Sequence, residues 1–194
     1  MFTLYFPAHA AKICAMSTTI ETQNERGLAC LRIAVGVLFL IFGQYKVFST
    51  YFTLHGGFQF WIHRFLENNA AYPFMVPVLK GFVLPHATPI AFLVAYGELA
   101  IGLALTLGLL VRPASVAGLV FMLTLLFSSN HPGPDAHLWE YFGASLDHSV
   151  LAFCFSTFLI ARADSVWSVT SLWSRRMHGG NVTDQIYAGK SPAA

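Results

Sequence analysis

The chain has 194 residues, of which 56% are hydrophobic and only 10% are charged, and its formal net charge is +2. Soluble domains average about 25% charged residues, so this composition excludes an ordinary soluble protein and predicts one integral membrane domain. The small net charge, without a cluster of lysines or arginines, excludes nucleic acid as a partner.

Residues 1–27 are expected to form a polar or disordered lead-in outside the membrane. They lack the basic start and the long apolar core of a secretory signal peptide. Met16 begins the polar run MSTTIETQNERG, which is typical of residues that precede a first membrane span. The first fifteen residues are therefore expected to be either a misassigned start or a disordered tail.

The first predicted span, residues 28–48, carries two cations on one face. Arg32, Phe39 and Lys46 are seven residues apart and therefore share a side of the helix. Two interpretations of Arg32 and Lys46 stay open. Either both lie near the span ends and reach the headgroups, or both line the inward face and one neutralises a carboxylate on another helix.

The long connection of residues 49–87 is too interrupted to span and too apolar for water. The segment 58–66 has an apolar aromatic face, and three prolines, Pro73, Pro77 and Pro85, divide the rest of the connection. We therefore expect one or two helices that lie in the membrane interface and cap the bundle. This arrangement predicts that Trp61 or His63 lies near the outer helix ends, together with His86 and His148.

The second predicted span, residues 88–111, contains a single charge, Glu98. A helix of this length is about 36 Å long and crosses a hydrocarbon core of about 30 Å, with Glu98 roughly 15 Å below the outer end. A carboxylate at that depth costs at least ~2.5 kcal/mol unless it faces a partner, a cavity or a proton. The other helices must therefore give Glu98 a polar neighbour.

A tight turn at Arg112 leads into a third predicted span, residues 114–129, and a polar loop precedes a fourth, residues 148–162. The predicted fold is an all-α integral membrane four-helix bundle, with a membrane domain over residues 28–176 and a disordered tail over 177–194. Basic residues flank the bundle on one side: Lys12, Arg26, Arg112, Arg162, Arg175, Arg176 and Lys190. The positive-inside rule then places both termini in the cytoplasm, with the protein in the plasma (inner) membrane.

Two stretches resemble the DoxX/DoxD family of small four-span membrane proteins. They are LRIAVGVLFLIFGQYKV, with Arg32 and Lys46, and GELAIGLALTLGLLVRPA, with Glu98. The resemblance covers roughly residues 28–176. The family includes the small subunit of a thiosulfate:quinone oxidoreductase, and other members look like membrane partners of redox enzymes. Members often carry Trp-Ser-Leu-Asp after the last helix; here Val-Thr follows Trp-Ser, so no role of that aspartate carries over.

The histidines form a second group of candidate residues, because most of them fall in the two outer loops or at the outer helix ends. These are His55, His63, His86, His131, His137 and His148. Their spacings match no zinc motif, so no metal site is predicted. They are either ordinary interfacial residues or part of a site that handles protons or a quinone headgroup.

Two interpretations of the function stay open. In the first, the protein is a membrane subunit of a quinone-linked oxidoreductase, possibly one that oxidises sulfur compounds. The catalytic candidates are then Glu98 with Arg32 or Lys46, and the quinone-contacting candidates are Trp61, His86 and His148. In the second, the protein is a non-catalytic membrane anchor or assembly partner of a redox complex, and Glu98 only fixes the helix register.

The chain carries no nucleotide or flavin fingerprint, so a quinone or a protein partner must carry the electrons. A transporter is a weaker third option, because no inverted repeat is evident. An apolar cavity with a few polar groups at its head would favour the quinone interpretation, whereas a tightly packed bundle would favour the anchor.

Overall fold

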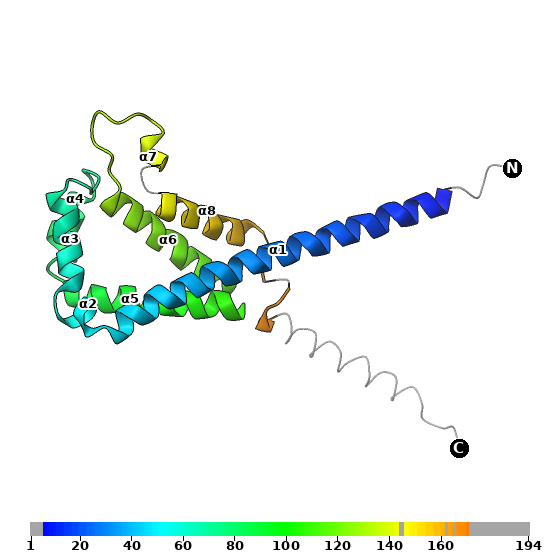
Figure 1. The fold of residues 1–194 in the computed structure, drawn as a ribbon, viewed down its shortest axis with the longest axis horizontal. Helices are drawn as coiled ribbons and strands as arrows, with labels where there is room; N and C mark the ends of the chain where they lie inside the picture. The colour runs from blue at the N-terminus through cyan, green and yellow to red at the C-terminus, as the bar shows by residue number, and fades with distance from the viewer. Residues whose placement is uncertain (1–5, 144–145, 162, 165, 171–194) are drawn as a thin grey trace, which may run out of the picture.

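The computed structural model describes residues 6–143, 146–161, 163–164 and 166–170, and over these residues every regular element is helical. Four helices run back and forth to form the bundle (Figure 1): α1 (Phe6–Phe48), α5 (Ala87–Leu107), α6 (Val111–Ser129) and α8 (Leu146–Ile160). The predicted all-α membrane bundle is confirmed. Three stretches are long and apolar enough to cross a membrane, namely Thr22–Phe48, α5 and α6, whereas the apolar α8 is shorter.

The first helix differs from the prediction in its starting point. α1 begins at Phe6, so residues 6–27 continue the helix where the sequence predicted a polar or disordered lead-in. Residues 6–16 contain four alanines and no glycine, with a proline in the first turn, and these residue types favour a helix start. A helix also extends at little cost from a turn that is already formed. The predicted tail over residues 177–194 lies outside the described residues.

The bundle consists of two closely packed pairs, α1 with α5 and α6 with α8. Glycines make the close approach of α1 and α5 possible, because a Cβ at Gly36, Gly43 or Gly102 would lie 2.6–2.7 Å from an atom of the facing helix. In the second pair, the ring of Phe155 lies directly over Gly118. Small residues at such contacts let helix backbones approach closely in lipid.

The two ends of the bundle differ. At one end, here called the turn end, Gly108 closes α5 in a left-handed conformation and α6 begins at Val111. At the opposite end, here called the loop end, α1 and α6 finish and α5 and α8 begin (Figure 1). The long first connection and the loop after α6 both lie at the loop end.

The first connection covers the loop end with short helical segments, as predicted, but there are four of them where one or two were expected. It contains α2 (Thr50–Leu54), α3 (Gly57–Glu67), α4 (Val76–Val78) and a π-helical turn, η1 (Leu79–Val83). α3 runs across the bundle rather than along it (Figure 1). Phe58 and Ile62 on its inner face are buried in a small core with Leu79 and with Ala87 and Ala91 of α5.

Hydrogen bonds fasten this connection to the end of α6. The backbone N–H of Tyr72 donates to the carbonyl of Phe127 at 2.9 Å, and that of His131 donates to the carbonyl of Ala70 at 2.8 Å. Burial raises the pKa of the Tyr72 phenol above its ordinary value, and the neighbouring Tyr141 raises it further. The loop after α6 includes α7 (Glu140–Gly143). The two connections therefore form one layer at the loop end.

Candidate functional site

A buried ion pair joins the two helices of the first pair. Lys46 Nζ on α1 donates a hydrogen bond to Glu98 Oε1 on α5 at 2.5 Å, and the two side chains are 23% and 6% exposed. Gly43, one turn before Lys46, allows this contact because a Cβ there would lie 2.7 Å from the backbone nitrogen of Leu99. Glu98 thus points into the bundle towards a cation, as the sequence predicted, while the catalytic roles of both residues stay predictions.

Arg32, the other candidate partner, does not reach Glu98. Its side chain is 0% exposed, and it donates from Nη1 to the carbonyl of Ala163 at 3.0 Å and from Nη2 to that of Trp167 at 2.6 Å. Fourteen residues separate Arg32 from Lys46, which is about 21 Å along a helix. The backbone carbonyls after α8 need donors, and a guanidinium supplies two in a fixed fork. Arg32 therefore fastens the chain after α8 to α1 instead of lining a site with Glu98.

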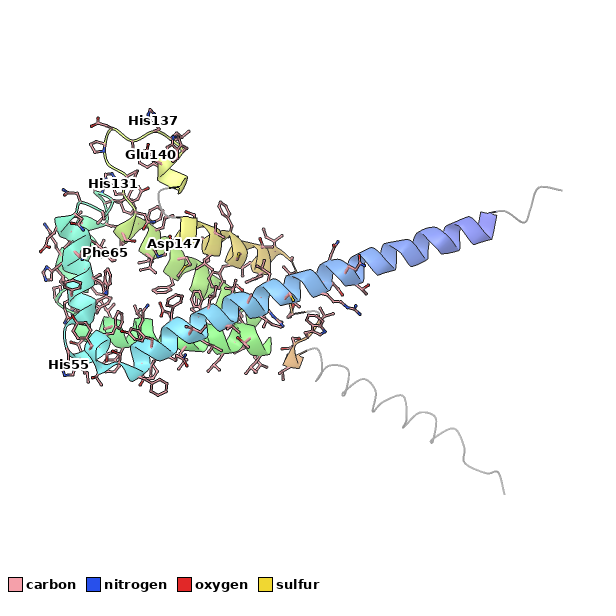
Figure 2. All side chains as sticks on the ribbon, in the orientation of Figure 1. His55, Phe65, His131, His137, Glu140 and Asp147 are labelled. Carbon is pink, nitrogen blue, oxygen red and sulfur yellow. The ribbon has the colours of Figure 1, made fainter. Side chains whose placement is uncertain are left out.

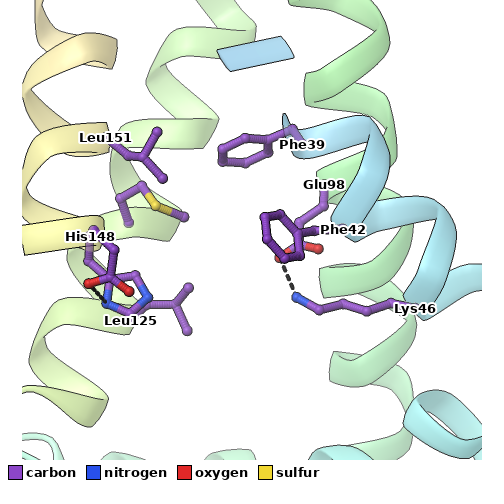
Figure 3. Close-up of a pocket in the computed structure, with 9 residues that line it drawn as sticks. Phe39, Phe42, Lys46, Glu98, Leu125, His148 and Leu151 are labelled. Atoms are coloured by element: carbon purple, nitrogen blue, oxygen red, sulfur yellow. Dashed lines mark hydrogen bonds and ion pairs between the residues drawn. The ribbon is translucent and has the colours of Figure 1, made fainter. Parts of the chain in front are cut away.

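The ion pair lines a cavity of about 280 Å³ between the two helix pairs, here called the polar cavity. Its lining residues are Phe39, Phe42, Lys46, Glu98, Met122, Leu125, Asp147, His148 and Leu151. Figure 3 shows Lys46 and Glu98 on one wall, facing His148, Leu125 and Leu151 on the other. The charged pair therefore faces open volume rather than packed side chains.

Two buried polar atoms in this cavity have no hydrogen-bond partner among the described residues. They are Oε2 of Glu98 and Nδ1 of His148, although the latter lies 3.5 Å from Oδ1 of the exposed Asp147. Buried polar atoms in folded proteins are normally satisfied, so such atoms facing a cavity can receive a small polar group. The ammonium of Lys46 adds a donor at the same place.

A second cavity, of about 520 Å³, lies under α3 and is here called the apolar cavity. Its lining residues are Ile41, Phe42, Tyr45, Lys46, Phe52, Phe58, Trp61, Ile62, Phe65, Val94, Phe121 and Leu125. Among these lining residues, Lys46 is the only lysine, arginine, histidine or carboxylic acid. Phe42, Lys46 and Leu125 line both cavities, which are therefore adjacent.

A family model described as DoxX matches residues 27–131, which is more than half of the chain. The chain belongs to the DoxX family. No curated protein and no solved structure matches it in the same comparisons. The matched region of this DoxX-family protein contains Lys46 and Glu98 and ends before α8, so His148 lies outside it.

The predicted quinone-contacting residues separate into two groups. His148 lines the polar cavity and Trp61 lines the apolar cavity, so both are near Lys46. His86 is not, because it lies exposed at the start of α5, with Nδ1 2.9 Å from the carbonyl of Phe82 and its ring against the Phe82 ring. The prediction that His86 joins the site is therefore not supported by its position.

The other histidines of the predicted group, His55, His63, His131 and His137, lie in the two connections at the loop end, as the sequence predicted. Figure 2 shows His131 and His137 in the connection after α6, together with Glu140, and His55 at the junction of α2 and α3. Within the described part of the chain, no three histidine, cysteine or acidic residues come close enough to hold a metal ion.

Sequence reasoning did not single out several residues that line the polar cavity. Phe42 could have been found, because it lies three residues after Phe39 and four before Lys46 on the same face of α1. Met122 and Leu151 had no such signal, because the apolar residues of α6 and α8 favour no one side of the helix. The charged residues of these two helices, Arg112 and Asp147, lie in the first turn of each.

Proposed function

We propose that this DoxX-family protein is the integral membrane subunit of a quinone-linked oxidoreductase, and that its polar cavity receives the quinone headgroup. One observation carries the proposal: the Lys46–Glu98 pair is buried inside a membrane bundle and yet faces a cavity with His148 on the opposite wall. A pair that served only to join two helices would need no open volume beside it.

The lining residues match the chemistry of a quinone carbonyl. A quinone oxygen accepts hydrogen bonds, and the Lys46 ammonium can donate one without leaving Glu98, because it has three donors. Reduction of a quinone to a quinol consumes two electrons and two protons. The electrons come from a reduced protein partner, because the chain carries no redox cofactor motif.

Glu98 and His148 are the proposed proton-transferring groups. The free Oε2 of Glu98 and the imidazole of His148 both line the cavity, and the exposed Asp147 connects His148 to the solvent at the loop end. Each of the two protons that the quinone takes up can therefore pass from outside through His148, directly or by way of the Glu98 carboxylate. The family resemblance suggests a partner that oxidises a small donor such as a sulfur compound. The distribution of the basic residues favours a plasma membrane location with both termini of this subunit in the cytoplasm.

The alternative is a non-catalytic anchor or assembly partner. The observation in its favour is Arg32, a buried cation whose hydrogen bonds only fasten the chain after α8 to α1. In that case the Lys46–Glu98 pair would have the same role, and the open volume beside it would have no ligand.

The test is quinone binding and quinone-dependent turnover of the purified complex, in a mild detergent, with Glu98→Gln and Lys46→Gln variants. Both variants are expected to abolish turnover while helix content and thermal unfolding midpoint show a folded protein. Matched controls are Glu67→Gln and Lys80→Gln, because both residues are exposed and line neither cavity. Unchanged turnover in the Glu98→Gln protein would leave the anchor interpretation standing.

A further inference from the structure

The apolar cavity is open at its rim on the side of α1 and α3. Trp61 and Tyr45 line it and are 47% and 71% exposed. In membrane proteins, tryptophan and tyrosine side chains are enriched where the hydrocarbon meets the headgroups. A long hydrocarbon chain can therefore enter this cavity sideways, without passing through water.

The size of the polar cavity limits what it can hold. Small-molecule sites occupy roughly 300–1,000 Å³, and the polar cavity, at about 280 Å³, lies just below that range. It accommodates one small polar ring but not a ring with a long substituent. The adjoining apolar cavity, at about 520 Å³, supplies the missing volume and is walled almost wholly by hydrocarbon.

Lys46 stands at the junction of the two cavities. Its ammonium bonds Glu98 in the polar cavity and lies 5.2 Å from the ring centre of Phe52 and 6.0 Å from that of Phe121, both of which line the apolar cavity. A ligand whose polar head lies at Lys46 can therefore extend an apolar substituent under α3.

We propose that the apolar cavity binds the hydrocarbon tail of the ligand, so that the protein selects a long-chain quinone over a tail-less one. The inference rests on the proposed function, because it takes the headgroup to lie in the polar cavity. Trp61 and Val94 are the specificity-determining residues: Trp61 forms the rim of the tail cavity, and Val94 of α5 lines its wall.

The experiment compares binding of a long-chain quinone and of the same quinone without its tail, to the full-length protein in nanodiscs of one lipid composition. The quinone partitions into the lipid equally for every variant, so differences between variants report the cavity. We expect Trp61→Ala and the cavity-filling Val94→Phe to weaken long-chain binding by about tenfold, since losing even one methylene contact can cost that much. Binding of the tail-less quinone is expected to stay within about twofold.

Trp139→Ala is the matched control, because Trp139 is exposed and lines neither cavity. Equal affinity for both quinones, unchanged in the Trp61→Ala and Val94→Phe proteins, would overturn the tail cavity and leave the headgroup site intact. Failure of the wild-type protein to bind either quinone would overturn the proposed function and this inference with it. Trp61→Ala keeps the test decisive if Val94→Phe does not fold, because Trp61 is half-exposed.

Discussion

Arg32 and Lys46 lie on the same face of one helix, and the structure uses their charges in opposite ways. Arg32, towards the turn end, is fully enclosed and both of its hydrogen bonds go to backbone carbonyls. Lys46, towards the loop end, bonds a side-chain carboxylate and borders two cavities. A shared helical face therefore predicts that a residue points inward, but not whether it is sealed or accessible.

Phe39 marks the boundary between these two regions. Midway between the two cations, its ring packs edge-on against Phe155 of α8 at 5.3 Å and against Phe121 of α6 at 6.5 Å between ring centres. These contacts join the two helix pairs. From Phe39 towards the turn end the pairs are in contact, and towards the loop end they leave the volume that Figure 3 shows.

The largest expected effect on stability comes from replacing Arg32, the fully enclosed cation. Arg32→Leu is expected to lower the free energy of unfolding by about 3 kcal/mol or more, because hydrogen bonds from a buried charged group contribute roughly 1.5–3 kcal/mol each. Arg32→Lys is expected to recover only part of this loss, since a single ammonium cannot reproduce the fork. Thermal and denaturant unfolding in detergent measures both. A stability equal to that of the wild type would contradict the structural role of Arg32.

The close contact between Gly43 and α5, one turn before Lys46, gives the second prediction. Gly43→Ala is expected to cost about 1–3 kcal/mol, as overpacking does, because the new Cβ meets the backbone of Leu99. It should also weaken quinone binding by separating Lys46 from Glu98. Gly97→Ala on α5 is the matched control, because a Cβ there meets nothing within 4 Å. The contact would be shown to be loose if both variants behaved alike in unfolding and binding.

The ion pair itself should show coupling. Lys46→Gln and Glu98→Gln are each expected to destabilise the protein by about 1–3 kcal/mol, because each single change leaves a buried charge without its ionic partner. The double variant is expected to lose less than the sum of the two. Unfolding of the four proteins under one set of conditions gives the coupling energy. Simple additivity would mean that the two charges do not interact across the helices.

The smallest expected effect separates the two candidate histidines. His148→Gln is expected to change quinone affinity severalfold and to alter the pH dependence of turnover, because the imidazole lines the polar cavity. His86→Gln is expected to leave both unchanged, because that residue lies outside both cavities. Titration of the two variants side by side measures this, and equal responses would contradict the assignment of His148.

The sequence alone predicted the features that one helix carries by itself. A lone carboxylate in an apolar run had to face inward, and the seven-residue spacing placed Arg32 and Lys46 on one face of α1. Whether that face points into the bundle stayed open. The choice between Arg32 and Lys46 could not be made, because it depends on which turn of α5 lies beside each of them. Nor could the cavities be predicted, since their volume arises where the two helix pairs diverge, which no single hydrophobic pattern encodes.

The shortness of α8 has a consequence for the surrounding bilayer. Its 15 residues span about 22 Å, whereas the hydrocarbon core is about 30 Å thick. Such hydrophobic mismatch is relieved when lipids thin locally around the short helix. α8 carries His148 on the wall of the polar cavity. The lipid headgroups should therefore dip towards this wall, and water should come closer to the Lys46–Glu98 pair from this side than from the longer α5.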